Sequence, residues 1–130
     1  MPTGRAGGER GAAVVDFVLV MVLLVPLVLG IAQVALVLHV RNTLASAASE
    51  GARASAPLGA TPADGAARTR SMIRRVLADR YADDVSATWT TIGGASATAV
   101  VVHARVPALG LFGPSVSLTV RGHAIRDVAP

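Results

Sequence analysis

The sequence predicts an α+β protein: a single N-terminal transmembrane helix extending into a stalk, then a small extracytoplasmic domain with one helix on a three-stranded antiparallel sheet. Three observations predict this fold class. Residues 17–40 are 24 consecutive residues without a formal charge, and residues 64–80 carry an apolar stripe at helical spacing. Three later runs alternate between apolar and polar side chains, as strands with one covered face do.

The uncharged run is long enough to cross a bilayer. At the helical rise it extends for roughly 36 Å, against a hydrocarbon core of about 30 Å. A helix that is apolar on every face must be buried in lipid or inside a large protein, and 130 residues do not make a large protein. The run is also longer than the apolar core of a cleaved secretory signal, about 7–15 residues. We therefore expect residues 12–40 to form a retained membrane anchor.

Two residues inside the run have specific expected effects. Pro26 removes one backbone hydrogen bond and clashes with the preceding turn, which predicts a kink in the helix. Gln33 is a polar side chain at membrane depth, where it could form an intramembrane hydrogen bond to a partner helix.

A carboxylate, Asp16, stands at the start of the run beside an aromatic residue, Phe17. One interpretation is electrostatic, because an acid in the first turn of a helix is stabilised by the macrodipole. The other is functional, because carboxylates in or beside a membrane segment are costly and tend to be paired or to have a role.

The neighbouring residues favour the functional interpretation. Gly11, four small or apolar residues and then Asp16-Phe17 resemble the processing motif of Tad-type pilins and pseudopilins, in which Glu usually stands at the Asp16 position. The surrounding pattern is similar to TadE-like proteins, minor pilin-like components of the tight-adherence pilus machinery. This similarity is strongest over residues 9–55, and it rests on Arg10, Pro26, Arg41 and the stretch Glu50-Gly51-Ala52-Arg53.

The resemblance implies a pilin-like bitopic membrane protein that assists assembly of a bacterial tight-adherence (type IVb, Flp-type) pilus or a related type II or type IV secretion system. It implies a processing motif made of Gly11, Ala12, Asp16 and Phe17, cut by a prepilin peptidase between Gly11 and Ala12. The implied partners are this peptidase, other pilin-like subunits, the pilus machinery and membrane lipid. Residues 1–11 would be a cytoplasmic leader-like tail of a single-pass protein in the cytoplasmic (inner) membrane, with the C-terminal domain outside.

The alternative function is a signal-anchored extracytoplasmic binding or interaction module that no prepilin peptidase processes. Under this alternative, residues 1–11 stay attached as a simple cytoplasmic tail.

Residues 41–63 are expected to form a stalk helix and a linker. Small residues recur at helical spacing, so this face suits close packing against another helix or is a plain Ala-rich stalk: Ala45, Ala48, Ala52 and Ser55. Pro57 and Pro62 then bound a helix-breaking linker.

The domain of residues 64–130 begins with a helix to about residue 80, for which Asp64 is the expected N-cap. Its apolar stripe consists of Met72, Ile73, Val76 and Leu77. Four arginines fall on the remaining arc, without the aromatic residues or groove-reading motif of a nucleic-acid site: Arg68, Arg70, Arg74 and Arg75. We interpret this arc as a solvated face and expect no nucleic-acid partner.

Three strands should follow, over residues 85–91, 98–106 and 116–125, with a turn at Gly93-Gly94. Alternation assigns these side chains to the covered face: Val85, Ala87, Trp89, Val100, Val102, Ala104, Val106, Val116, Leu118, Val120 and Ala124. The helix of residues 64–80 is expected to cover this face. Between the last two strands, Leu109, Leu111 and Phe112 form either an interaction surface or a lid over the sheet edge.

The composition gives little support for catalysis. The chain has no Cys, and therefore neither a disulfide nor a thiolate site. His103 and His123 are expected on the outer sheet face, where they could be neighbours, but no third metal ligand accompanies them. Ser, Asp and His residues occur without a nucleophile–base pattern. We expect no enzymatic activity, no cofactor and no metal.

Overall fold

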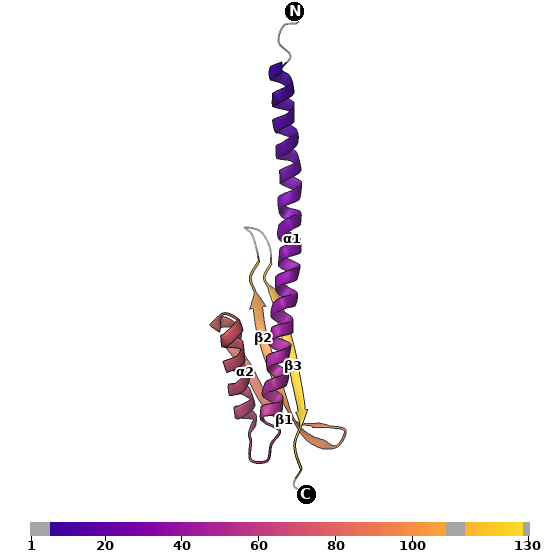
Figure 1. Ribbon diagram of the computed structural model, residues 1–130. Helices are drawn as coiled ribbons and strands as arrows, with labels where there is room; N and C mark the ends of the chain where they lie inside the picture. Colours follow the sequence, from indigo (N-terminus) through magenta and orange to yellow (C-terminus); the bar gives the residue numbers. More distant parts are fainter. Residues whose placement is uncertain (1–5, 109–113, 129–130) are drawn as a thin grey trace, which may run out of the picture.

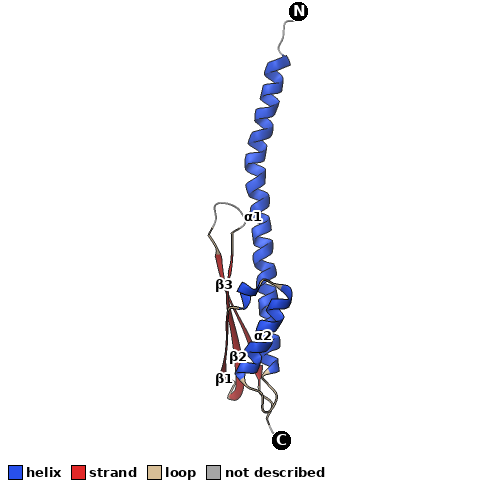
Figure 2. Ribbon diagram, turned by 90° about the vertical axis from the view of Figure 1, so that its left-hand side faces the viewer, coloured by secondary structure: helices blue, strands red, loops and turns tan. Residues whose placement is uncertain are grey.

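The computed structural model describes residues 6–108 and 114–128. Its elements in chain order are two α-helices, a short 3₁₀ helix and three strands: α1 (Ala6–Ala54), α2 (Pro62–Val76), η1 (Asp79–Ala82), β1 (Asp84–Ile92), β2 (Ala95–Val106) and β3 (Val116–Ile125). Figure 1 and Figure 2 show both α-helices on the same face of one sheet, with the N-terminal half of α1 projecting alone beyond the domain. The predicted α+β class is confirmed.

Helix α1 is one element of 49 residues that continues unbroken through Pro26. At 1.5 Å per residue it is about 74 Å long, more than twice the thickness of a bilayer core. The predicted anchor and the predicted stalk are therefore two halves of the same helix.

The sheet is antiparallel in the order β1-β2-β3, as the alternating runs predicted. Gly93 and Gly94 join β1 to β2 in a two-residue turn with φ angles of 57° and 83°. Positive φ at both central residues gives the turn twist that matches a hairpin, and glycine adopts it without steric cost. In the β2–β3 register, Val102 lies opposite Val120 and Val100 lies opposite Gly122.

The core lies between the sheet and the C-terminal half of α1. We expected the helix of residues 64–80 to cover the sheet, but α1 lies over β2 and β3 while α2 packs beside it toward β1. The reason is the narrow face of α1, where Ala48 and Ala52 are fully buried, as is Ser55 just beyond the end of the helix. Of the two alternatives left open for this face, the structure shows close packing rather than a plain stalk, and its partners are the sheet and α2 of the same chain.

Two glycines make the close approach of α1 possible. A Cβ at Gly122 of β3 would collide with the backbone of Ala48, and a Cβ at Gly51 would collide with the hydroxyl of Thr69 in α2. Thr69 Oγ1 donates to the Gly65 carbonyl at 2.8 Å or to the Ala47 carbonyl at 3.3 Å. At these two points the elements therefore meet through backbone rather than through large side chains.

The N-terminus of α2 differs from the prediction by three residues. Thr61, not Asp64, is the N-cap, because Pro62 suits the first helical position. The side chains of Thr61 and Asp64 together form a capping box. The Thr61 backbone N–H donates to Asp64 Oδ2 at 2.7 Å, and the Thr61 hydroxyl donates to the same oxygen at 2.9 Å. These hydrogen bonds lower the pKa of the exposed Asp64 carboxyl, the backbone one most.

The apolar stripe predicted for α2 is only partly correct. Ile73 is fully buried, but Val76 is 64% exposed, since α2 ends there and the chain turns into η1. The buried face consists instead mainly of small residues that contact α1: Gly65, Ala66, Thr69 and Ile73. Arg70, assigned to a solvated face, donates through Nη2 to the Val85 carbonyl at 2.8 Å.

Trp89 is the clearest exception on the sheet. It was assigned to the covered face, yet it is 46% exposed, and the Arg126 guanidinium lies 4.3 Å from its ring centroid. The helices that cover the sheet end before the level of Trp89, so a cation–π contact with Arg126 replaces apolar burial of its ring.

Candidate functional site

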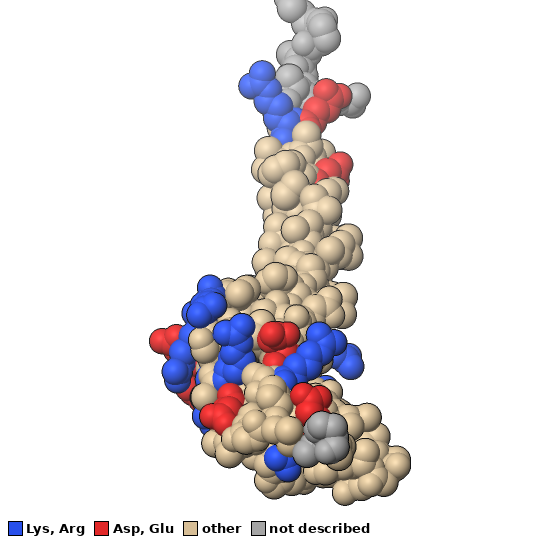
Figure 3. Space-filling model, turned by 60° about the horizontal axis from the view of Figure 1, so that its bottom comes forward, with Lys and Arg blue, Asp and Glu red and all other residues tan. Residues whose placement is uncertain are grey.

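Residues 17–33 of α1, called the shaft below, carry no charged side chain. Figure 3 shows charged side chains on the domain and at the N-terminal end of the helix, with an uncharged surface between them. Leu23 is 77% exposed and Ile31 is 63% exposed, and none of the most apolar 18-residue window is buried by the rest of the protein. A helix of this length and apolarity is consistent with a single-pass membrane anchor.

The predicted processing motif lies on α1 at the N-terminal end of this shaft. Gly11, Ala12, Asp16 and Phe17 are all exposed, and the helix already begins at Ala6, so the Gly11–Ala12 bond lies within it. Ala12 and Asp16 are four residues apart and therefore share one face of the helix. Within the described residues, the side chain of Asp16 has no hydrogen bond or ion pair.

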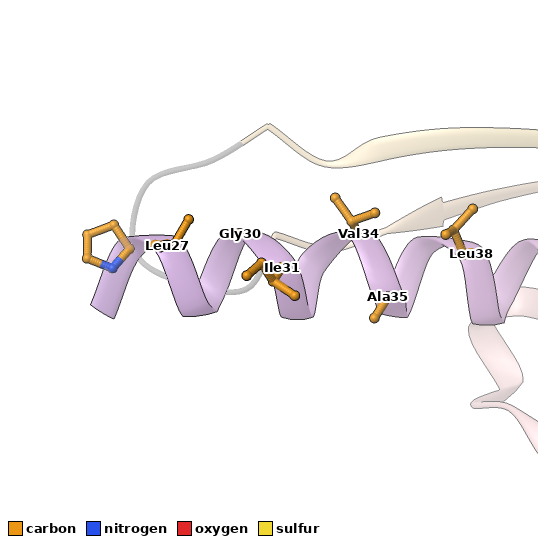
Figure 4. A pocket seen from close by; sticks show the side chains of 7 residues that line it. Leu27, Gly30, Ile31, Val34, Ala35 and Leu38 are labelled. Atoms are coloured by element: carbon orange, nitrogen blue, oxygen red, sulfur yellow. The ribbon is translucent and has the colours of Figure 1, made fainter. Parts of the chain in front are cut away.

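A shallow apolar hollow lies on one side of the shaft, where Gly30 lacks a side chain. It is lined by seven residues of α1, which Figure 4 shows: Pro26, Leu27, Gly30, Ile31, Val34, Ala35 and Leu38. A Cβ at Gly30 would meet no atom within 4 Å. The hollow is thus open to whatever surrounds the shaft.

The shaft meets the domain at Gln33. Its side-chain Nε2 donates to the Pro107 carbonyl at 3.2 Å, at the end of β2. From the next turn onward α1 packs against the core, where Val40 is only 1% exposed. A hydrogen bond from Gln33 to a partner helix was one possibility, and the hydrogen bond to Pro107 lies within its own chain. Leu109, Leu111 and Phe112 lie outside the described residues.

The two outer-face histidines are not neighbours. His103 lies opposite Thr119 in the β2–β3 register, four positions from the level of His123, or about 13 Å along a strand. His103 Nδ1 and Thr119 Oγ1 are 3.0 Å apart and share a hydrogen bond. In the part of the chain that the structure describes, no group of three His, Cys, Asp or Glu residues could hold a metal ion.

The structure also brings together two arginines that the sequence did not connect. Arg41 of α1 and Arg121 of β3 line one groove, together with Ala45, Thr119 and Val120. Alternation alone placed Arg121 on the outer face of the sheet. Only the docking of α1 along β3 brings it near Arg41, and no local sequence signal reports that docking.

Comparison with known families gives one match, over residues 11–53, to the family described as TadE-like protein. No curated protein and no solved structure matches the chain. The matched segment includes the processing motif, the uncharged shaft and most of the half of α1 that packs in the domain. The resemblance inferred from the sequence is therefore confirmed: residues 11–53 of this chain form a TadE-like segment.

Proposed function

We propose that this protein is a pilin-like bitopic membrane protein that assists assembly of a tight-adherence pilus or a related secretion system. The observation that carries the proposal is the extent of the TadE-like match, residues 11–53, which includes both halves of α1. The family similarity thus extends over the lipid-facing shaft and over the part of the helix on which the domain is built. A role in assembly also agrees with our expectation that the chain is not an enzyme.

In this proposal the shaft spans the cytoplasmic membrane, with the N-terminus in the cytoplasm and the domain outside. A prepilin peptidase cuts between Gly11 and Ala12, which leaves a free amine on Ala12. Asp16, one helical turn away and without a partner in the described residues, then neutralises that amine or the amine of a neighbouring subunit. Pairing between subunits would set the register of their helices.

The hollow at Gly30 supports lateral contact with other pilin-like subunits. Helices associate in membranes through van der Waals packing at small residues, because lipid tails are as apolar as the side chains. A side chain of a neighbouring helix would fit where Gly30 leaves space between Leu27 and Val34.

The alternative function, an unprocessed extracytoplasmic binding module, has one observation in its favour. The helix runs continuously from Ala6 through the Gly11–Ala12 bond, so residues 6–11 can serve as an ordinary extension of the anchor.

The N-terminal sequence and intact mass of the protein from its native membranes separate the two functions. A start at Ala12 supports prepilin-type processing, whereas a start at Met1 or Pro2 supports the binding module. A start near Ala48 would contradict both, because it removes Val40 and Leu44 from the core and leaves a secreted domain.

Replacement of the carboxylate tests the proposed pairing. Asp16→Ala should abolish assembly with other subunits while membrane insertion is retained, because the apolar shaft is unchanged. Asp16→Glu, which restores the usual family residue, should assemble normally, and Glu9→Ala should have no effect because Glu9 lies in the removed leader. Co-purification of subunits from membranes measures the result, and normal assembly of Asp16→Ala would reject the pairing.

A further inference from the structure

We propose that the outer face of the sheet, which is the face turned away from α1 and α2, is the contact surface for a second copy of this chain in the same membrane. Figure 2 shows both α-helices on one side of the three strands, so neither of them covers the other side. An antiparallel sheet can leave one face to water, and that face is then polar along its strands. The outer face of this sheet departs from that pattern over the part farther from the shaft.

That part of the outer face carries little charge. Three consecutive rows of the register place a small or apolar residue of β2 between β1 and β3: Ser86–Val101–Arg121, Thr88–Ala99–His123 and Thr90–Ala97–Ile125. Ile92 lies one row farther along β1, and it is 40% exposed while Ile125 is 56% exposed. Among these residues only Arg121 has a formal charge. Depletion of charged side chains is what distinguishes the core of a protein interface from ordinary surface.

The membrane restricts how two copies can meet through this face. Figure 1 shows β2 and β3 running along the axis of α1. Two copies anchored in one membrane point their shafts the same way, so a two-fold axis between them must run along the strands. Sheets that pack face to face in the aligned manner cross at about 30°. Each shaft then tilts by about 15°, which is within the usual range for membrane helices.

This axis makes the face complementary to itself. The partner's β2 lies opposite β2, so the short side chains of Ala97, Ala99 and Val101 meet at the centre and allow the two sheets to approach closely. The partner's β3 lies opposite β1, and the partner's β1 lies opposite β3. The two shafts lie on the far sides of the pair of sheets, so the hollow at Gly30 stays open to other subunits.

The charges at the two rims of the face favour a second copy as the occupant. Asp84 is the one charged residue of β1 and Arg121 is the one charged residue of β3, and alternation directs both side chains to the outer face. Asp84 lies in the row of Thr119, two residues from Arg121, so it is offset from the partner's Arg121 by about 7 Å along the strands. A long arginine side chain spans that offset. Neither side chain has a hydrogen bond or an ion pair within residues 6–108 and 114–128.

The contact ends toward the membrane. Beyond Val101, β2 carries His103 and Arg105 on the outer face, and each would meet its own equivalent across the axis. The remaining patch is about 14 Å wide and about 23 Å long, which is smaller than the interface of a stable soluble dimer. The dimer therefore depends on the anchoring of both copies in one membrane, which raises their local concentration.

Cross-linking of the full chain in its native membranes tests the proposal, because the chain has no cysteine. Ala99→Cys places a thiol at the centre of the outer face, within reach of the partner's thiol for a short bismaleimide. Ala67→Cys, at an exposed position of α2 on the other side of the domain, is the matched control. Denaturing electrophoresis and mass spectrometry measure the yield and the mass of the product. Ala99→Cys should give at least about fivefold more cross-linked dimer of this chain than Ala67→Cys, because only the outer faces meet across the axis.

Charge exchange then tests the arrangement of the two copies. In the Ala99→Cys chain, Asp84→Arg and Arg121→Asp should each lower the dimer yield about tenfold, because like charges then face each other at both rims. Both positions are exposed, and the double variant Asp84→Arg/Arg121→Asp should restore the yield because the opposite charges are paired again.

Three results would overturn the proposal. They are equal cross-linking of Ala67→Cys and Ala99→Cys, a double charge variant that cross-links as poorly as the single ones, and a product of Ala99→Cys that contains only another protein. The dimer requires the membrane anchor but not the pilus role. Its yield should therefore be the same whether or not the Gly11–Ala12 bond is cut, so failure of the proposed function would leave this result unchanged.

Discussion

The two halves of α1 differ in side-chain size and have opposite surroundings. In the N-terminal half, large side chains face outward on every side, and Leu23 is 77% exposed. In the C-terminal half, Leu44 is fully buried and its neighbours are small, with Gly51 and Ala48 in direct contact with α2 and β3. Side-chain size separates the halves, because a sheet and a second helix can approach only where the helix surface is narrow. One continuous helix is thus exposed over its first half, as a membrane anchor would be, and packed in protein over its second.

Leucine truncation in each half should show the largest contrast. Leu44→Ala leaves a cavity in the core and should destabilise the domain by about 2–5 kcal/mol. Leu23→Ala, the matched control in the shaft, should leave domain stability unchanged because Leu23 contacts none of the domain. Thermal unfolding of the detergent-solubilised full chain, followed by circular dichroism, measures both. Equal destabilisation by the two variants would mean that the halves do not differ as described.

Glycine substitution should give the next largest contrast. Gly122→Ala forces β3 away from the Ala48 backbone and should cost roughly 3 kcal/mol, at the upper end for overpacking. Gly30→Ala has open space around its Cβ and should cost nothing in the domain. The same unfolding measurement applies, and a stable Gly122→Ala variant would show that α1 is not held so close to the sheet.

The sequence predicted the elements better than their packing. The uncharged run, the Gly93-Gly94 turn and the alternation in β2 and β3 are local signals, and the structure confirms them. The position of α1, rather than α2, over β2 and β3 depends on a contact between Gly122 and Ala48, which are 74 residues apart. The local pattern of apolar and polar residues does not predict such a long-range contact. The exposure of Trp89 and the groove between Arg41 and Arg121 follow from the same docking, so they too were not predictable.

The capping box of α2 should have the smallest effect. Thr61→Ala removes the N-cap hydroxyl and should cost about 1 kcal/mol. Folding lowers the pKa of Asp64, so the ionised carboxylate stabilises the folded domain. This stabilisation is complete above the ordinary Asp pKa of about 3.9 and is lost as pH falls through the lower pKa of the folded state. In Asp64→Asn, the stability of the domain should therefore fall less steeply with decreasing pH in this acidic range. An unchanged acid limb would contradict the assigned cap.

The passage of α1 from lipid into protein can be measured directly, because the chain has no cysteine. Single variants Leu23→Cys, Ile31→Cys, Ser46→Cys and Arg53→Cys, all at positions exposed on α1, would be treated with a membrane-impermeant maleimide in intact membranes and again in denaturing detergent. We predict that Ser46→Cys and Arg53→Cys react from the extracytoplasmic side, while Leu23→Cys and Ile31→Cys react only in detergent. Rapid labelling of Leu23→Cys and Ile31→Cys in intact membranes would contradict the account, because it would place the shaft in water.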